Sequence, residues 1–488
     1  MNRQIRKLGV ALLAMFTVLF VQLNYIQVFK APSLDRHPGN SRKVVEGFSQ
    51  PRGTIVSADG TVLAKSVPSK DQFKFQRVYP EGELFGHVTG YLNFNFGSTG
   101  LESTYGDDLA GRTPGLDLQK LSDLFVSKTR VGNVNISIRK DVQEVARQAL
   151  AGRAGSVVAV DPKTGAILAF YSSASYDPNP LASHGVDAGR ARTLLSAAPS
   201  KPLLPKMYAE TFFPGSTFKV VTGSIGLQSG KVTLTTPSYP VLTGYKIDFT
   251  KKLLSNFGGE SCGGTLPEIL KVSCNSSFAA MGNETIGTAG MVAGAEAFGF
   301  NSRPPIDLPA AAPSVFPTAF PKDQGNGPIA RASIGQGDTK ATPLEMALVA
   351  AAIANGGDMM TPHLMTTITD DQGRVVKRYT PTVWKRPISP QNAELMRQAM
   401  IGVVQGGTAT RLAIPGYEVG GKTGTAQFGI DPPTSHAWII GYAGPPGDPK
   451  VAVAVIVEAQ AGPASEATGG RIAAPIGQAV MAKILADG

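Results

Sequence analysis

Residues 214–220 read Pro-Gly-Ser-Thr-Phe-Lys-Val, two loop formers followed by a helical pattern that continues to Leu227. Ser216 is predicted at the start of this helix, and a spacing of three places Lys219 on the same helix face. A serine hydroxyl attacks only when a base removes its proton, and a lysine held neutral by burial or by a second cation is such a base. A helix N-terminus also directs backbone N–H groups toward developing negative charge. The stretch therefore predicts a nucleophilic serine with a lysine base.

The Ser-x-x-Lys spacing is common, and the chain holds a second copy in Ser137 and Lys140. Ser137 falls in the alternating pattern Val134 to Ile138, which predicts a strand, and residues three apart on a strand face opposite sides. The second copy is therefore predicted to be structural. A lone Ser-x-x-Lys is usually a coincidence of spacing, so the assignment of Ser216 and Lys219 needs further elements.

A second element is Ser273-Cys274-Asn275, a Ser-x-Asn sequence. Before it, Thr265 and Glu268 have the spacing of a capping box for a short helix that reaches Val272. Apolar residues over 278–281 predict another helix after it. The three residues are expected to fill the connection and to present side chains to a cleft, although Ser and Asn in loops usually serve only the turn.

A third element is Lys422-Thr423-Gly424-Thr425, preceded by glycines that leave its backbone uncovered. A strand edge without side-chain cover can approach a peptide substrate closely. Lys422 supplies a cation, and Thr423 and Thr425 supply hydroxyls. An earlier copy, Lys163-Thr164-Gly165, lies in an Asp-Pro-Lys-Thr-Gly stretch that suits a hairpin turn and needs no other explanation.

Each element is weak alone, but Ser-x-x-Lys, Ser-x-Asn and Lys-Thr-Gly in this order are found together in β-lactamases and penicillin-binding proteins. Over nearly its whole length the sequence resembles the class B penicillin-binding proteins. Its short N-terminal module, with the pair Cys262 and Cys274, is most similar to the actinobacterial penicillin-binding protein A group. Further stretches that resemble the family are Gln50–Gly53, Thr99–Glu102, Tyr176–Asn179, Gly335–Gly337 with Thr342–Leu344, and Gly407–Ala409.

The resemblance implies roles for four catalytic residues. Ser216 would be the acylated nucleophile and Lys219 its base. Ser273 would pass a proton to the leaving amine. Lys422 would keep Lys219 neutral and orient Ser273.

It also implies how the substrate, a peptidoglycan stem peptide ending in D-Ala-D-Ala, is bound. Asn275 would hold the acyl amide, and Thr423 and Thr425, with Gly424 between them, would bind the terminal carboxylate. Backbone N–H groups of Ser216 and Thr425 would form the oxyanion hole. The family's reaction is acyl transfer in a D,D-transpeptidase: D-alanine leaves, and an amine of a neighbouring stem peptide attacks the acyl-enzyme. β-Lactams would be covalent inhibitors.

The expected fold is α/β. Strand patterns at 156–160, 166–170, 437–441 and 451–457 enclose helical patterns, and a helix is expected over 472–485. This favours one antiparallel sheet covered by helices, the penicillin-binding and β-lactamase-like transpeptidase domain that the resemblance implies. We expect residues 1–30 to be a cytoplasmic tail and anchor, 31–140 a β-rich, dimerisation-type module, and 141–488 the transpeptidase domain.

The N-terminal segment predicts an uncleaved anchor in the cell membrane. Arg3, Arg6 and Lys7 precede Leu8–Phe29, which carries no charge and spans about 33 Å as a helix. No small-x-small cleavage site follows. The preceding positive charges predict a cytoplasmic N-terminus, one membrane crossing and an extracytoplasmic catalytic domain.

Composition supports a globular chain and disfavours several other classes. The chain is 42% hydrophobic and 17% charged, with a net charge of +10. Its basic residues form no stripe with aromatics, so nucleic-acid binding is not expected. The five histidines are scattered, which predicts no metal site, and Gly335 and Gly337 lack the context of a nucleotide loop, so no cofactor is expected. Cys262 and Cys274 form either a disulfide, as exported chains allow, or two buried thiols.

Other classes of protein share some of these features. A β-lactamase needs a carboxylate for deacylation, and no Glu-x-x-Leu-Asn follows Ser273. A D,D-carboxypeptidase or a β-lactam sensor would carry the same site, and a non-catalytic divisome scaffold would carry a vestigial one. The sequence before residue 150 is too short for a glycosyltransferase domain. A polytopic glycosyltransferase and divisome proteins are expected partners by resemblance, with a role in cell division or cell shape.

Overall fold

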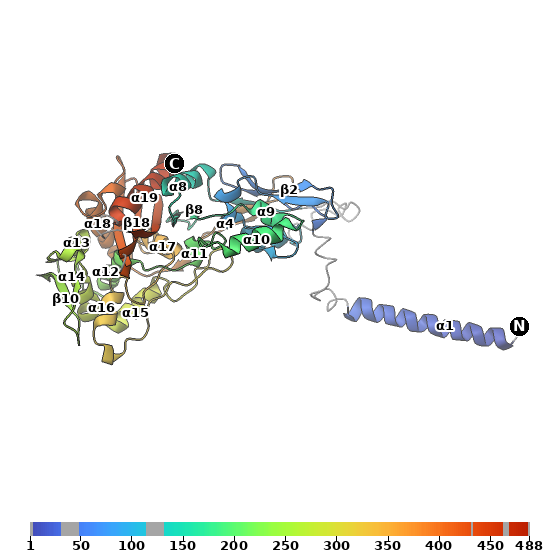
Figure 1. The fold of residues 1–488 in the computed structure, drawn as a ribbon, viewed down its shortest axis with the longest axis horizontal. Coiled ribbons are helices and arrows are strands. Elements are labelled where there is room, and N and C mark those ends of the chain that lie inside the picture. Colours follow the sequence, from blue (N-terminus) through green and yellow to red (C-terminus); the bar gives the residue numbers. More distant parts are fainter. Residues whose placement is uncertain (1–2, 31–47, 114–130, 431–432, 462–467, 487–488) are drawn as a thin grey trace. The chain divides into compact units, whose positions relative to one another are not determined.

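The computed structural model describes residues 3–30, 48–113, 131–430, 433–461 and 468–486 (Figure 1). The chain divides into two compact units: Met1–Pro51 with Val67–Gln76, and Arg52–Ser66 with Arg77–Gly488. The expected module at 31–140 includes residues 31–47 and 114–130, which lie outside the described residues. The site belongs to the second unit.

The N-terminal segment is helical, as predicted. Helix α1 (Arg3–Asn24) continues into a π-helix, η1 (Tyr25–Lys30), and α1 buries none of its side chains. In the described part of the chain, α1 alone is long and apolar enough to cross a membrane, by length and composition.

The larger sheet confirms the expected antiparallel architecture. Its order is β17 (Glu418–Ile430), β18 (Pro433–Gly444), β19 (Val451–Ala461), β7 (Gly155–Val160) and β8 (Ile167–Ser173). Every neighbouring pair is antiparallel. The two ends of the catalytic segment therefore meet in one sheet, and β17 forms its edge.

Helices cover both faces of this sheet. Residues Val451–Val457 of β19 are all buried, and consecutive residues of a strand face opposite sides, so both faces are covered. Helix α17 (Pro343–Ala354), buried along its length, packs on β7, β18 and β19. The C-terminal helix α19 (Gly469–Ala486) packs on β18, β19 and α8 (Lys140–Leu150).

A smaller sheet combines distant parts of the sequence. Its order is β15 (Val375–Arg378), β14 (Met365–Thr369), β6 (Asn133–Ile136), β1 (Ile55–Val56), β2 (Val62–Pro68) and β3 (Phe75–Val78). Strand β14 pairs with β6 through partners such as Ile368 and Val134. The β-rich N-terminal segment thus completes its sheet with two strands that come more than 200 positions later.

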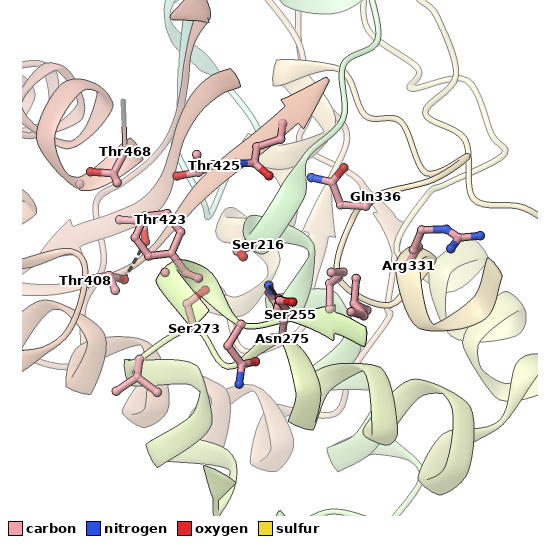
Figure 2. A pocket seen from close by; sticks show the side chains of 18 of the residues that line it. Ser216, Ser255, Ser273, Asn275, Arg331, Gln336, Thr408, Thr423, Thr425 and Thr468 are labelled. Atoms are coloured by element: carbon pink, nitrogen blue, oxygen red, sulfur yellow. Dashed lines mark hydrogen bonds between the residues drawn. The ribbon is translucent and has the colours of Figure 1, made fainter. Parts of the chain in front are cut away.

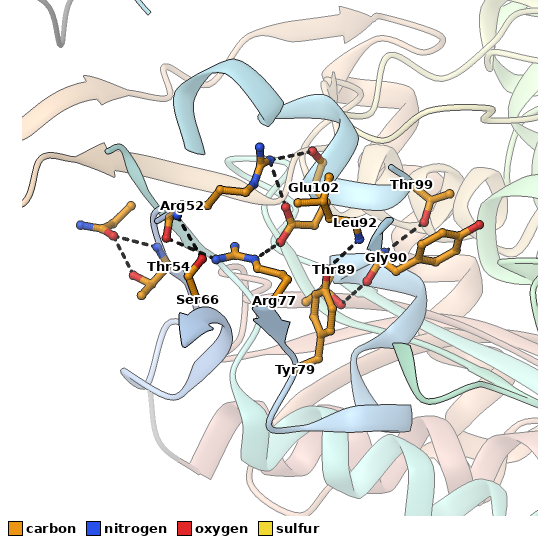
Figure 3. Close-up of polar contacts among 12 residues, drawn as sticks. Arg52, Thr54, Ser66, Arg77, Tyr79, Thr89, Gly90, Leu92, Thr99 and Glu102 are labelled. Carbon is orange, nitrogen blue, oxygen red and sulfur yellow. Dashed lines mark hydrogen bonds and ion pairs between the residues drawn. The ribbon is translucent and has the colours of Figure 1, made fainter. Parts of the chain in front are cut away.

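A buried ion cluster holds the N-terminal segment together (Figure 3). Glu102 is fully buried on α5 (Gly100–Thr104), and its carboxylate accepts from Arg52 Nη2 at 3.1 Å and from Arg77 Nε at 2.5 Å. Burial alone raises the pKa of Glu102, but the two arginines hold it below its ordinary value. Two of the stretches that resemble the family, Gln50–Gly53 and Thr99–Glu102, therefore meet in this cluster. The first contributes Arg52 and the second contributes Glu102.

A helical layer beside β17 carries the remaining site residues. Its helices and small strands are α12 (Lys219–Gln228), α13 (Leu266–Lys271), α14 (Asn275–Ala280), α15 (Thr288–Ala297), α16 (Gly327–Ala332), α18 (Pro390–Gly406), β9 (Tyr239–Leu242), β10 (Gly244–Lys246), β11 (Leu253–Ser255) and β12 (Cys262–Gly264). The capping box predicted for Thr265 and Glu268 is present at the start of α13.

Candidate active site

An open cleft of about 860 Å³ contains the three sequence elements (Figure 2). Ser216 comes from the short 3-10 helix η4 (Gly215–Phe218) and Ser273 from the turn between α13 and α14. Asn275 comes from the start of α14, and Thr423 and Thr425 come from β17. Lys219 and Lys422 are fully buried behind them. The structure therefore brings together residues that are far apart in the sequence.

Ser216 lies at the start of a helical segment, as predicted, and its loop is anchored on both sides. The Gly215 N–H donates to the carbonyl of Gly335 at 2.9 Å. Gly335 has φ +73, and a Cβ there would lie 2.2 Å from the Gly215 carbonyl oxygen, so only glycine fits. Trp438 Nε1 donates to the Phe213 carbonyl at 3.0 Å. These contacts fix the approach to Ser216 while leaving its side chain partly exposed.

Lys219 is held among acceptors of the second element. Its Nζ donates to the Ser273 carbonyl and to Asn275 Oδ1, each at 2.7 Å, and lies 3.2 Å from Ser273 Oγ. Burial and the charge of Lys422 lower its pKa well below the ordinary value. A neutral amine has two N–H donors, which the two short bonds use, so its lone pair remains for a hydroxyl. In the described residues no hydrogen bond joins Lys219 to Ser216.

Ser273 has a backbone conformation that the sequence does not predict. It has φ +63, the left-handed region that non-glycine residues seldom adopt. The Ser273 N–H donates to the Leu270 carbonyl and the Cys274 N–H to the Ile269 carbonyl, so these bonds close the C-terminus of α13. The turn places Ser273 Oγ between the two lysines.

Lys422 donates from Nζ to Ser273 Oγ at 2.8 Å and to the Thr423 carbonyl at 2.9 Å. Burial lowers its pKa to about 7. Two ammonium groups this close to one hydroxyl repel each other, so protonation of Lys422 favours the neutral form of Lys219.

Asn275 opens α14, and Cys274 before it is disulfide-bonded to Cys262. The expectation that all three residues fill the connection is therefore wrong for Asn275, which belongs to the first helical turn. Its Nδ2 donates to the Ser255 carbonyl of β11 at 2.9 Å, while its Oδ1 accepts from Lys219. Of the two possibilities for the cysteines, the structure has the bridge.

On β17, alternate residues face the cleft. Thr423 and Thr425 line it, and the Thr423 hydroxyl lies 2.6 Å from that of Thr408. Gly424 lies between them and faces the other way, where a Cβ would come within 2.9 Å of the Pro214 carbonyl oxygen. Gly424 thus lets β17 pack against the segment that carries Ser216.

The second copies of Ser-x-x-Lys and Lys-Thr-Gly have structural roles, as predicted. For Ser137 and Lys140, however, the reason is not that they face opposite sides of one strand. Ser137 and Lys140 do not share a strand, because β6 ends at Ile136 and Lys140 begins α8. Ser137 donates to the Ile167 carbonyl, and Lys140 pairs with Glu81. Lys163 lies in the β7–β8 turn and pairs with Asp448.

Several lining residues were not predicted as site residues. Arg331, Gln336 and Thr408 come from or adjoin stretches that supported only the family resemblance, whereas Ser255 and Phe257 come from segments without a motif. Across the described residues, no group of three or more His, Cys, Asp or Glu side chains could hold a metal ion.

Comparison with protein families gives two matches. The penicillin-binding protein transpeptidase domain matches residues 155–482, and the penicillin-binding protein A dimerisation domain matches residues 52–134. Among curated proteins, the peptidoglycan D,D-transpeptidase PbpA of Mycolicibacterium smegmatis is 38% identical over 100% of both chains. PbpA of Mycobacterium tuberculosis is 37% identical over 99% of this chain and 98% of its own.

Solved structures agree with this similarity. Penicillin-binding protein A of M. tuberculosis, as a ceftriaxone acyl-enzyme complex, superposes with a TM-score of 0.81 at 36% identity, covering 90% of this chain and 99% of its own. Its penicillin G acyl-enzyme complex gives a TM-score of 0.80 at 36% identity, covering 89% and 99%.

Proposed function

The chain belongs to the penicillin-binding protein transpeptidases, and we propose that it cross-links peptidoglycan as a D,D-transpeptidase through an acyl-enzyme on Ser216. The observation that carries the assignment of residues is the convergence of two buried lysines on Ser273 Oγ, within the cleft that contains Ser216. Such an arrangement supplies one neutral base and one cation to the same reaction.

In the first half-reaction Ser216 Oγ attacks the carbonyl carbon of the penultimate D-alanine while Lys219 Nζ takes the hydroxyl proton. The C–N bond then breaks, and the proton passes from Lys219 through Ser273 to the leaving amine of the terminal D-alanine. The distances of 3.2 Å and 2.8 Å around Ser273 Oγ support this relay, with Lys422 orienting the hydroxyl.

In the second half-reaction an amine of a neighbouring stem peptide attacks the ester carbon. Lys219 takes the proton of the attacking amine and returns it to Ser216 Oγ as the ester bond breaks. Thr423 and Thr425 bind the terminal carboxylate of the donor before acylation, and the spare N–H of Asn275 Nδ2 holds its acyl amide.

The composition of the cleft disfavours a β-lactamase that uses a carboxylate for deacylation. Among the described lining residues there is neither Asp nor Glu, so the cleft offers no carboxylate to activate a deacylating water. A β-lactamase would release hydrolysed drug and a carboxypeptidase would release D-alanine without transfer, whereas a scaffold would form no product.

The test uses the full-length chain in detergent, incubated with benzylpenicillin and analysed by intact mass and peptide mapping. A long-lived single adduct on the Ser216 peptide, absent from Ser216→Ala, supports the proposal. Rapid drug loss without an adduct indicates a hydrolase. Release of D-alanine from a donor peptide without transfer to an added amine indicates a carboxypeptidase.

We further propose that residues 1–30 anchor the chain in the cell membrane with a cytoplasmic N-terminus, that 31–140 form a β-rich, dimerisation-type module, and that 141–488 form the extracytoplasmic transpeptidase domain. The apolar helix α1 supports the anchor. A role in cell division or cell shape, with a polytopic glycosyltransferase or divisome proteins as partners, accords with this topology. Protease added to intact spheroplasts should digest residues 141–488 if the topology is correct.

A further inference from the structure

Arg331 is the one charged side chain among the described residues that line the active-site cleft. It lies in the last turn of α16 and is exposed. Within the described part of the chain, no carboxylate forms a salt bridge with its guanidinium. The proposed reaction assigns it no role.

The surroundings of Arg331 hold its backbone and leave room for its side chain. The Gln336 N–H donates to the Arg331 carbonyl at 3.0 Å, so the loop at Gly335–Gly337 is tied to this residue. A Cβ at Gly327 would lie 3.3 Å from Arg331 Nη1, and one at Gly337 would lie 3.5 Å from Arg331 Cβ. A Cβ at Gly337 would thus make only an ordinary contact with Arg331, and one at Gly327 would touch only the far end of its side chain.

The charge of the cleft favours an anionic ligand. Lys422 lies behind its floor, Arg331 lies at its rim, and none of the described lining residues is acidic. A cleft with charges of one sign attracts and orients ligands of the opposite sign. An arginine binds a carboxylate through two parallel hydrogen bonds, which also fixes the orientation of the ligand.

Figure 2 places Arg331 on the opposite side of Ser216 from Thr408 and Thr423. In the proposed reaction the terminal carboxylate of the donor lies at Thr423 and Thr425, and the carbonyl under attack lies at Ser216. The part of the donor that precedes D-Ala-D-Ala therefore extends toward Arg331.

We propose that Arg331 is a specificity-determining residue, which binds a side-chain carboxylate on the residue that precedes D-Ala-D-Ala in the donor peptide. This inference rests on the proposed transpeptidase function and adds the substrate class that the site prefers.

The test compares two synthetic donors that end in D-Ala-D-Ala and differ only in the preceding side chain, which ends in a carboxylate or in the corresponding carboxamide. The readout is D-alanine release by the full-length chain with an added amine acceptor. The ratio of kcat/KM for the carboxylate donor over the carboxamide donor is expected to fall about tenfold in Arg331→Gln, as a charged hydrogen bond is lost. In Arg331→Glu the preference should reverse.

The matched control is Arg303→Gln, which removes an exposed arginine that does not line the cleft. An unchanged ratio in Arg331→Gln, or an equal fall in Arg303→Gln, would overturn the inference. Benzylpenicillin acylation of Ser216 is measured in the same samples. If adducts form but the ratio is unchanged, only the role of Arg331 fails, whereas no adduct in the wild-type chain means that the proposed function fails as well.

Discussion

Lys422 Nζ donates to Ser273 Oγ at 2.8 Å, although 149 positions separate the two residues. The same hydroxyl lies 3.2 Å from Lys219 Nζ. One hydroxyl thus links the two buried lysines, and their mutual repulsion sets which of them carries the proton.

The rate of acylation should depend on pH with two limbs. Lys219 must be neutral to act as a base, and its pKa is lowered by burial and by the charge of Lys422. Lys422 must be cationic, and burial lowers its pKa to about 7. The second-order rate constant for benzylpenicillin should therefore rise as Lys219 deprotonates and fall above about pH 7 as Lys422 loses its proton. Quenched-flow mass spectrometry measures it, and a rate that keeps rising through pH 9, about two units above that pKa, contradicts the role of Lys422.

Asn275→Asp should disable the base without removing it. The substitution puts a carboxylate where Oδ1 now accepts from Lys219 at 2.7 Å, which raises the pKa of Lys219. Acylation at neutral pH should fall about a hundredfold, and the acid limb should move to higher pH. Asn95→Asp, at an exposed position outside the cleft, is the control. An acid limb that stays in place would show that Asn275 does not govern Lys219.

Breaking the Cys262–Cys274 bridge should loosen the turn that carries Ser273. The bridge closes a loop of 12 positions, which stabilises the folded chain by about 3 kcal/mol through loop-closure entropy. The double variant Cys262→Ser with Cys274→Ser should lose thermal stability and acylate about tenfold more slowly, because Ser273 and Asn275 flank the bridge. Reductant should slow the wild-type chain to the same extent. Equal rates with and without a confirmed bridge would refute the link to catalysis.

Glu345 should make stability depend on pH. It lies fully buried in the first turn of α17, neither of its carboxylate oxygens has a partner among the described residues, and burial raises its pKa to about 8, against the opposing charge of Lys385. The folded chain then holds a proton that the unfolded chain loses above about pH 4.5, so the contribution of Glu345 to stability falls as pH rises from about 4.5 to about 8.

Glu345→Gln removes this titration, because an amide resembles the protonated acid in shape and charge. Its Tm should exceed that of the wild-type chain at about pH 8 and approach it near pH 5. Glu260→Gln, at an exposed position, controls for the loss of one charge. A difference in Tm between the wild-type chain and Glu345→Gln that stays constant across this interval would mean that Glu345 does not titrate there.

The sequence predicts those features that depend on neighbours along the chain. The capping box of Thr265 and Glu268, the hairpin turn that holds Lys163, and the helical start at Ser216 each follow from spacings of a few residues, and the structure has all three. The antiparallel sheet follows from strand patterns at both ends of the catalytic segment.

Other features depend on tertiary packing. The pairing of β14 with β6, the left-handed conformation of Ser273 and the place of Arg331 on the cleft have no local signal. The sequence by itself determined the family and the motif residues, since local spacing and residue chemistry identify them. The tertiary structure alone decided that Lys219 and Lys422 meet at one hydroxyl and that both are buried, because pKa values depend on burial and on charges contributed by distant segments.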